Sequence, residues 1–146
     1  MSTSDDLASG PVEPAPNLPP RFRILVVDDD PQVCTLMQIF LRRVGVLVET
    51  APDGEAGWEC LQNQTYDLVV LDLVMPRLSG LDLARRIRSH SLTVPLVVVS
   101  GDLHQFDRSH LQSLQILEAF EKGFNFQELS RRLEALLLAQ PRPPSA

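Results

Sequence analysis

The chain is poor in the residues that mark membrane, secreted and thiolate-metal proteins. Its 146 residues include two cysteines, one tryptophan and one tyrosine. No segment approaches the ~20 consecutive apolar residues of a membrane helix, and the first residues lack the basic-then-apolar order of a signal peptide. Cys34 and Cys60 have no CxxC spacing, so we expect buried reduced thiols rather than metal ligands. These absences favour a soluble, cytoplasmic protein with no membrane partner.

Positive charge is scarce as well. The formal net charge is −6, from 13 basic and 19 acidic residues. Residues 1–20 hold three acids and no base, and residues 139–146 hold one arginine, so the stretch between them keeps a net charge of −4. This balance argues against direct binding of nucleic acid.

Proline separates the two ends of the chain from its middle. Five prolines fall within residues 10–20, and three more fall within residues 140–146. Such composition predicts disordered tails over 1–20 and 139–146. The remaining stretch, 21–138, is long enough to bury one stable hydrophobic core, so we expect a single folded domain there.

The middle of the chain alternates short apolar runs with amphipathic segments. The runs predict strands buried on both faces, and the 3.6-residue spacing of apolar side chains between them predicts helices. Pro31 suits the first turn of a helix, and Gly45 suits its end. The predicted strands cover 24–27, 46–50, 67–72, 94–100 and 116–121, and the predicted helices cover 31–44, 55–62, 81–89, 103–114 and 126–138. Five alternating pairs predict an α/β domain with a doubly wound parallel sheet.

Four of the predicted strands stop at a polar residue, and these residues form the candidate site. Asp28 and Asp29 follow the first strand, Asp72 ends the third, Ser100 ends the fourth and Lys122 follows the fifth. Parallel strands bring their carboxyl ends to one edge of the sheet, where ligands of such folds bind. Three carboxylates at one edge raise each other's pKa unless a cation lies between them. Hard oxygen ligands without nearby His or Cys favour Mg²⁺, and a hydroxyl and an ammonium complement the oxygens of a transferring phosphoryl group.

Lys122 is the only lysine among the thirteen basic residues. The chain uses arginine wherever a general positive charge serves, which indicates that this position needs a compact ammonium. Arginine-biased codon usage combined with chance is the alternative explanation.

The order and spacing of these residues resemble the receiver domain of two-component response regulators. The resemblance covers 21–138 and rests on four stretches: Ile24-Leu25-Val26-Val27-Asp28-Asp29-Asp30, Leu71-Asp72-Leu73-Val74-Met75-Pro76 with Gly80, Val99-Ser100-Gly101, and Phe120-Glu121-Lys122. It implies a flavodoxin-like (βα)₅ fold whose five-stranded parallel sheet has the order 2-1-3-4-5.

The resemblance also implies a function. Asp72 would accept a phosphoryl group from a phosphohistidine of a sensor histidine kinase or phosphotransfer protein. Asp28, Asp29, Asp72 and the backbone carbonyl of Val74 would hold Mg²⁺. The chain would be a single-domain response regulator that switches the binding of an unknown downstream protein, with a homodimer as one option. It would be a switch rather than an enzyme with a separate substrate.

In the family, the residues matching Ser100 and Lys122 read the state of the acceptor, and this part of the chain departs from the pattern. The family lysine is followed by a proline across a cis bond, where this chain has Gly123. Three residues before the lysine the family has an aromatic side chain, where this chain has Ala119. Phe120 would replace it only if the strand were shifted by one residue. Phosphorylation is therefore expected, while transmission of the signal is in question.

Two further positions tune the lifetime of the acyl phosphate in the family, and they match Val74 and Asp102. We expect a long-lived phosphoaspartate, because an apolar Val74 cannot position a water molecule and Asp102 adds negative charge near its approach.

Two alternatives remain at this stage. The first is a degenerate receiver that acts as a phosphorylation-independent interaction module, an idea favoured by Ala119 and Gly123. The second is a haloacid-dehalogenase-like phosphatase, since Asp28-Asp29-Asp30 fits a DxD nucleophile motif. Against the phosphatase, no acidic pair follows Lys122 and no cap domain fits the length.

Overall fold

The computed structural model describes residues 22–75 and 78–140 of the chain. The predicted tails lie outside these residues, apart from positions 139 and 140. The strands are β1 (Arg23–Val27), β2 (Leu47–Ala51), β3 (Leu68–Asp72), β4 (Leu96–Ser100) and β5 (Ile116–Glu121). The helices are α2 (Pro31–Arg42), α3 (Gly54–Asn63), α4 (Gly80–Ser89), the 3₁₀ helix η1 (Leu103–Gln105), α5 (Arg108–Ser113) and α6 (Phe126–Ala139). None of the helices in the described ranges is long and apolar enough to cross a bilayer.

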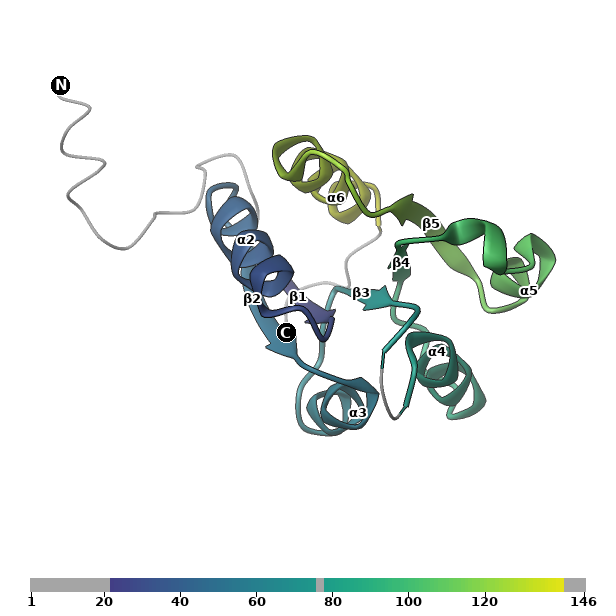
Figure 1. Ribbon diagram of the computed structural model, residues 1–146. Coiled ribbons are helices and arrows are strands. Elements are labelled where there is room, and N and C mark those ends of the chain that lie inside the picture. Colours follow the sequence, from purple (N-terminus) through teal and green to yellow (C-terminus); the bar gives the residue numbers. More distant parts are fainter. Residues whose placement is uncertain (1–21, 76–77, 141–146) are drawn as a thin grey trace, which may run out of the picture.

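The five strands form one parallel sheet in the order β2-β1-β3-β4-β5 (Figure 1). The order confirms the flavodoxin-like fold expected from the sequence. All residues of β3 and β4 are buried, as the unbroken apolar runs predicted, whereas the edge strands β2 and β5 are only partly covered.

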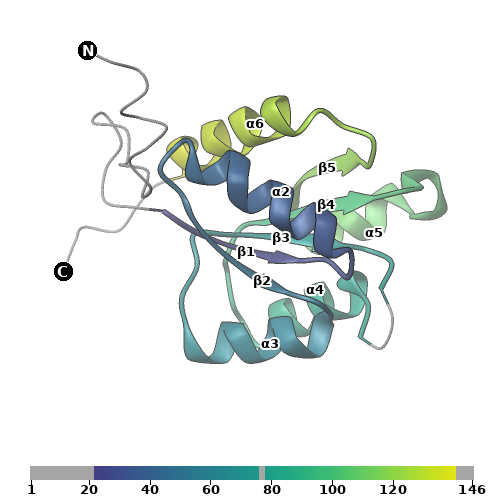
Figure 2. The ribbon, with the colours of Figure 1, turned by 60° about the vertical axis from the view of Figure 1, so that its left-hand side comes forward.

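Helices cover both faces of the sheet (Figure 2). Alternate residues of each strand point to opposite faces, so β1 contributes to two separate cores. Ile24 and Val26 belong to the core beneath α2 and α6, which we call the α2/α6 core. Leu25 and Val27 belong to the core beneath α3 and α4, called the α3/α4 core. Leu111 of α5 packs against the α3/α4 core, and Leu114, which follows α5, belongs to that core.

Polar side chains fix where the helices begin. Asp30 accepts a hydrogen bond from the backbone of Gln32 and caps α2, whose first residue is Pro31. Ser79 and Asn125 cap α4 and α6 in the same way. The bounds of most elements differ from the predicted ones by one or two residues, which is the usual uncertainty at helix and strand ends.

The predicted single helix over 103–114 is wrong. The segment consists of η1, a break at Phe106 and Asp107, and then the six-residue α5. The Asp102 side chain accepts from the backbone of His104 and caps η1. The Asp107 carboxylate accepts from Ser109 N at 3.0 Å and starts a new helix. The spacing of apolar residues predicted one helix, but the capping side chains of Asp102 and Asp107 divide the segment into two short helices.

Candidate functional site

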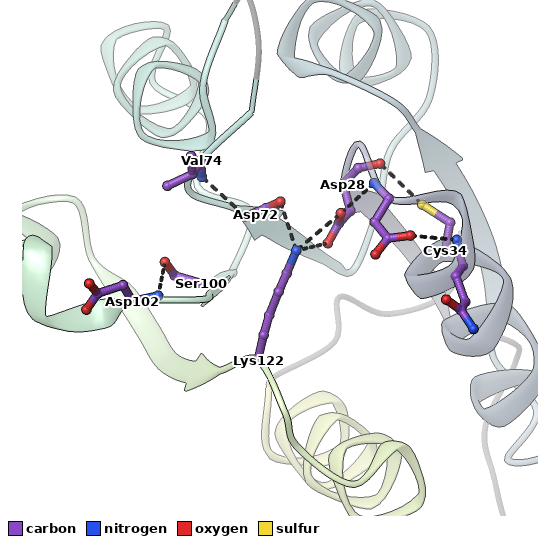
Figure 3. A network of polar contacts seen from close by, with 9 residues as sticks. Asp28, Cys34, Asp72, Val74, Ser100, Asp102 and Lys122 are labelled. Carbon is purple, nitrogen blue, oxygen red and sulfur yellow. Dashed lines mark hydrogen bonds and ion pairs between the residues drawn. The ribbon is translucent and has the colours of Figure 1, made fainter.

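The ends of β1, β3 and β5 bring Asp28, Asp72 and Lys122 into direct contact (Figure 3). The Lys122 Nζ atom lies 3.0 Å from Asp72 Oδ2 and 3.2 Å from Asp28 Oδ2. Asp28 and Asp72 are nearly inaccessible, with 2% and 3% of their surface exposed. The sequence-based expectation that these side chains meet at one edge of the sheet thus corresponds to the observed geometry.

Asp29 completes a cluster of three carboxylates. One oxygen from each of Asp28, Asp29 and Asp72 lies within 4.8 Å of the others. Asp29 is exposed, so the cluster opens to solvent on its side. Three negative charges around one ammonium leave the site with an excess of negative charge.

Backbone and thiol contacts fix the orientation of Asp28. Its N–H donates to Ala51 O at 3.0 Å, its Oδ1 accepts from Asp30 N at 2.8 Å, and its carbonyl accepts from the Cys34 thiol at 3.4 Å. Its Oδ2 is buried and accepts no hydrogen bond from the described residues, although Lys122 lies close enough for an ion pair. A buried carboxylate oxygen without a hydrogen bond is costly unless a cation compensates it.

Burial raises the pKa of Asp72 from 3.8 to about 6. The negative charge of Asp28 acts in the same direction, while the hydrogen bond from Lys122 and the one from Val74 N act against it. The Val74 N–H donates to Asp72 Oδ1 at 3.2 Å. For Lys122, burial lowers the pKa, but the hydrogen bond with Asp72 and the charge of Asp28 outweigh burial and raise it above its ordinary value. Lys122 is therefore fully charged. Its single positive charge balances only part of the negative charge of the neighbouring carboxylates.

The carboxylate cluster fits Mg²⁺. The donors are oxygen atoms of the kind that this ion prefers, and one of them is a buried oxygen lacking a hydrogen bond. The pKa of Asp72 is raised mainly by burial and further by the charge of Asp28, and a bound cation would counter both effects. No histidine or cysteine side chain belongs to the cluster, which makes zinc a poorer match.

Ser100 lies at the same edge but forms no hydrogen bond with Asp72 within the described part of the chain. It is fully buried, and its Oγ accepts from Asp102 N at 3.2 Å. The Asp102 carboxylate points away from Asp72 (Figure 3). It accepts hydrogen bonds from His104 N and from Gln105 Nε2 in η1. The Asp102 carboxylate is therefore engaged in capping η1, and its effect on the lifetime of an acyl phosphate stays a prediction.

The side chain of Val74 is 59% exposed beside Asp72. The start of α4 lies against the backbone of Asp72, because a Cβ atom added to Gly80 would lie 2.0 Å from Asp72 O. Only glycine allows this approach, which explains why the sequence pairs Gly80 with Asp72.

The strand β5 contains a bulge that decides which side chains face the site. Its register with β4 shifts between Leu96 and Val97. Phe120 then pairs with Val99 and packs against the α2/α6 core, with the Arg132 guanidinium 5.2 Å above its ring. Ala119 is exposed on the other side of the strand. Phe120 therefore does not replace the aromatic side chain that the family has at the position of Ala119.

Gly123 follows Lys122 with φ of 102°, and none of the described peptide bonds is cis. The turn after β5 thus uses the left-handed conformation that glycine permits, in place of the cis-proline geometry of the family.

Asp30 is not a second acid of the site. One oxygen of its carboxylate caps α2, and Asp30 does not belong to the cluster of Asp28, Asp29 and Asp72. What the sequence reasoning missed is the set of contacts that hold the site: the Asp30 N–H and the Cys34 thiol on Asp28. The only sequence signal for the first was the Asp-Pro pair at a helix start.

A groove of about 320 Å³ adjoins the carboxylates. It lies between the first turns of α2 and the end of β2. Its walls are formed by Asp28, Asp29, Pro31, Cys34, Thr35, Gln38, Thr50, Ala51 and Pro52.

Comparison with known proteins gives one consistent result. The family profile described as "Response regulator receiver domain" matches residues 24–134. The chain is 33% identical over 115 residues to the alkaline phosphatase synthesis transcriptional regulatory protein PhoP of Bacillus subtilis, covering 79% of this chain and 48% of that protein. It is 32% identical to the transcriptional regulatory protein RprY of Bacteroides fragilis, covering 80% of this chain and 50% of that protein. The chain thus spans about half the length of these curated relatives.

Solved structures agree with the sequence comparisons. The response regulator TrrA of Thermotoga maritima, solved in complex with Mg²⁺ and BeF, is 36% identical with a TM-score of 0.69, over 79% of this chain and 98% of that one. A receiver domain of a Francisella response regulator has a TM-score of 0.74 at 24% identity, over 81% of this chain and 98% of that one, and it supports the fold alone.

Proposed function

Since the chain belongs to the response regulator receiver domain family, we propose that it is a phosphoacceptor switch of two-component signalling in which Asp72 receives the phosphoryl group. The observation that carries the proposal is the cluster of Asp28, Asp29 and Asp72 around the Lys122 ammonium. Asp72 is the member at the end of a central strand, held by Lys122 on one oxygen and by Val74 N–H on the other.

The chemistry follows from this arrangement. A carboxylate oxygen of Asp72 attacks phosphorus, the bond between phosphorus and the imidazole nitrogen of a phosphohistidine breaks, and the histidine leaves with its electron pair. Lys122 neutralises part of the added negative charge, because its ammonium already contacts Asp72 Oδ2 at 3.0 Å. The site performs this step on itself, so the protein is a switch rather than an enzyme that turns over a separate substrate.

Mg²⁺ is the proposed cofactor, with Asp28, Asp29, Asp72 and the carbonyl of Val74 as its protein ligands. When bound, the ion would neutralise charge on the oxygens of the transferring phosphoryl group. The buried Asp28 Oδ2, which accepts no hydrogen bond from the described residues, supports this assignment.

The proposed receiver domain covers 21–138, with tails on both sides. Its phosphodonor is a sensor histidine kinase or a phosphotransfer protein, and its output is altered binding of a downstream protein or of a second copy of the chain. The family match over 24–134 supports the receiver part of this proposal.

A second candidate function is a receiver that binds partners without being phosphorylated. Two observations favour it: Ala119 provides no aromatic side chain on the η1 side of β5, and Gly123 forms a turn of a different geometry from that of the family. The intact carboxylate–lysine cluster favours the first candidate.

Incubation with acetyl phosphate and Mg²⁺, followed by a phosphate-affinity gel, distinguishes the two candidates. We expect a retarded band for the wild-type chain and for Asp82→Asn, a control that removes an exposed acid paired with Arg85. We expect no retarded band for Asp72→Asn. A wild-type chain that is never retarded, although it is folded, would favour the phosphorylation-independent module.

A further inference from the structure

The peptide group between Asp28 and Asp29 joins two of the proposed Mg²⁺ ligands. A peptide group is planar, so the direction of the Asp28 carbonyl also fixes the position of the Asp29 Cα atom. Asp29 is exposed, and its carboxylate makes no hydrogen bond or ion pair with the other described residues. The distance between the two carboxylates therefore depends on how this peptide group is held.

The Cys34 thiol holds the carbonyl of this peptide group. Its Sγ atom donates to Asp28 O at 3.4 Å, and among the described residues no backbone N–H donates to the same oxygen. The other contacts of Asp28 hold different atoms, since Asp28 N donates to Ala51 O and Asp28 Oδ1 accepts from Asp30 N. The thiol is therefore the contact that acts on the peptide group between the two acids.

Cys34 reaches this carbonyl because of where α2 begins. Asp30 caps the helix, Pro31 is its first residue, and the Cys34 N–H donates to Asp30 O at 3.2 Å. Side chains of a helix lean toward its N-terminus, so the thiol points back to the end of β1. Figure 3 shows Cys34 and Lys122 on opposite sides of Asp28. Lys122 contacts the carboxylate of Asp28, whereas the thiol contacts its backbone.

A thiol at this place suits the charge of the site. It donates a proton without carrying a charge, so it holds the backbone of Asp28 and adds no rival cation to the carboxylates. Cys34 is partly buried and lines the groove between α2 and β2. A smaller side chain would widen this groove rather than leave an enclosed cavity, so the fold should tolerate replacement of Cys34.

We propose that Cys34 is a positioning residue of the Mg²⁺ site, because its thiol holds the peptide group between Asp28 and Asp29 and so sets the distance between their carboxylates. The inference rests on the proposed function, since it requires these carboxylates to bind Mg²⁺. Loss of the thiol leaves both ligands in place but orders them less well, which lowers the affinity for Mg²⁺. Phosphorylation of Asp72 at saturating Mg²⁺ is unchanged, because the thiol bonds Asp28 and contacts neither Asp72 nor Lys122.

Calorimetric titration of the folded chain with Mg²⁺ tests the proposal without any phosphodonor. Cys34→Ala removes the donor, and we expect its dissociation constant for Mg²⁺ to be about three- to tenfold higher than that of the wild-type chain, the factor expected for one neutral hydrogen bond. Cys34→Ser differs from the alanine variant by a hydroxyl donor, so its constant should stay within about twofold of the wild-type value. An alanine variant that binds as tightly as the wild-type chain, or a serine variant that binds as weakly as alanine, would overturn the proposal.

Cys60→Ala is the matched control. Cys60 is the other partly buried thiol of the described residues, and it packs against the α3/α4 core on the opposite face of the sheet. Its replacement should leave the dissociation constant for Mg²⁺ unchanged, even where it lowers the free energy of unfolding. An equal loss of Mg²⁺ affinity in the two alanine variants would indicate a general loosening of the fold and would overturn the positioning role.

Phosphorylation by acetyl phosphate separates the positioning role from the proposed function. We expect Cys34→Ala to need about three- to tenfold more Mg²⁺ for half-maximal phosphorylation and to reach the wild-type rate when Mg²⁺ is saturating. A rate that stays low at saturating Mg²⁺, with an unchanged half-maximal concentration, would overturn the positioning role and leave the proposed function standing. A folded wild-type chain that neither binds Mg²⁺ nor becomes phosphorylated would overturn both.

Discussion

Replacing Asp72 by asparagine should stabilise the protein when Mg²⁺ is absent. The site crowds three carboxylates around one ammonium, and burial together with the charge of Asp28 raises the pKa of Asp72 to about 6. A carboxyl whose folded pKa lies about two pH units above the usual 3.8 costs about 3 kcal/mol when it is forced to ionise. The asparagine removes that cost but also weakens the contact with Lys122, so we expect a net gain of about 1–3 kcal/mol at pH 8.

The pH dependence has a defined sign. Between about pH 4 and pH 6 the folded chain retains a proton on Asp72 that the unfolded chain has lost. The contribution of Asp72 to the free energy of unfolding therefore falls as pH rises through this window and stays constant above it. Asp72→Asn should show its full gain at pH 8 and little of it at pH 4.

Mg²⁺ should narrow the difference in stability between Asp72→Asn and the wild-type chain. A ligand that binds only the folded chain adds about 1.4 kcal/mol of stability at ten times its dissociation constant. The wild-type chain should gain this stability, whereas Asp72→Asn, having lost one of the proposed ligands, should gain much less.

The assay is urea unfolding followed by the fluorescence of Trp58, the single tryptophan, which contacts His90 and Arg86 away from the carboxylates. Asp82→Asn serves as the control and should change neither the stability nor the response to Mg²⁺. An Asp72→Asn chain that is less stable than the wild type without Mg²⁺, or equally stabilised by Mg²⁺, would refute the reasoning.

Three further substitutions test other residues of the fold and the site. Gly80→Ala should lower the free energy of unfolding by about 2–4 kcal/mol, since its Cβ would lie 2.0 Å from Asp72 O, whereas Gly101→Ala, with no atom within 4 Å, should change it by less than about 0.5 kcal/mol in the same urea titration. Equal effects of the two alanines would contradict the close approach of α4. Arg88→Ala should cost about 2–3 kcal/mol, because it removes the donors to the carbonyl groups of Leu92, Leu114 and Gln115, and a loss below about 0.5 kcal/mol would show that these hydrogen bonds are weak. Val74→Asn should shorten the lifetime of the phosphorylated chain in a dephosphorylation time course by offering an amide that positions water, and an unchanged lifetime would remove Val74 from the account.

Much of the fold could be predicted because the strands β1, β3 and β4 are buried on both faces. Their continuous apolar runs can be recognised as strands without knowledge of tertiary contacts. Parallel pairing of these strands then brings Asp28, Asp72 and Ser100 to one edge of the sheet. The same argument explains why the carboxylate cluster could be predicted from a single sequence. The break between η1 and α5 could not, because Asp102 and Asp107 fit a helix pattern as well as they fit caps.

The contacts around the site were harder to predict for a different reason. The bulge in β5 sets the sides on which Ala119 and Phe120 lie, and nothing in the sequence marks it. The bonds from Arg88 to Leu114 and from Glu121 to Leu103 join residues 26 and 18 positions apart, so no local pattern reports them. Asp102 is an example. The sequence places it two residues after Ser100, but it does not show that the Asp102 carboxylate caps η1.

Identification of the phosphorylated residue tests the central claim most directly. The chain is treated with acetyl phosphate and Mg²⁺ and then with borohydride, which reduces an aspartyl phosphate to homoserine, and peptides are sequenced by mass spectrometry. The account predicts homoserine at position 72 alone, and none when Mg²⁺ is omitted. Homoserine at position 28 or 29, or its absence from a folded, Mg²⁺-treated chain, would contradict the account.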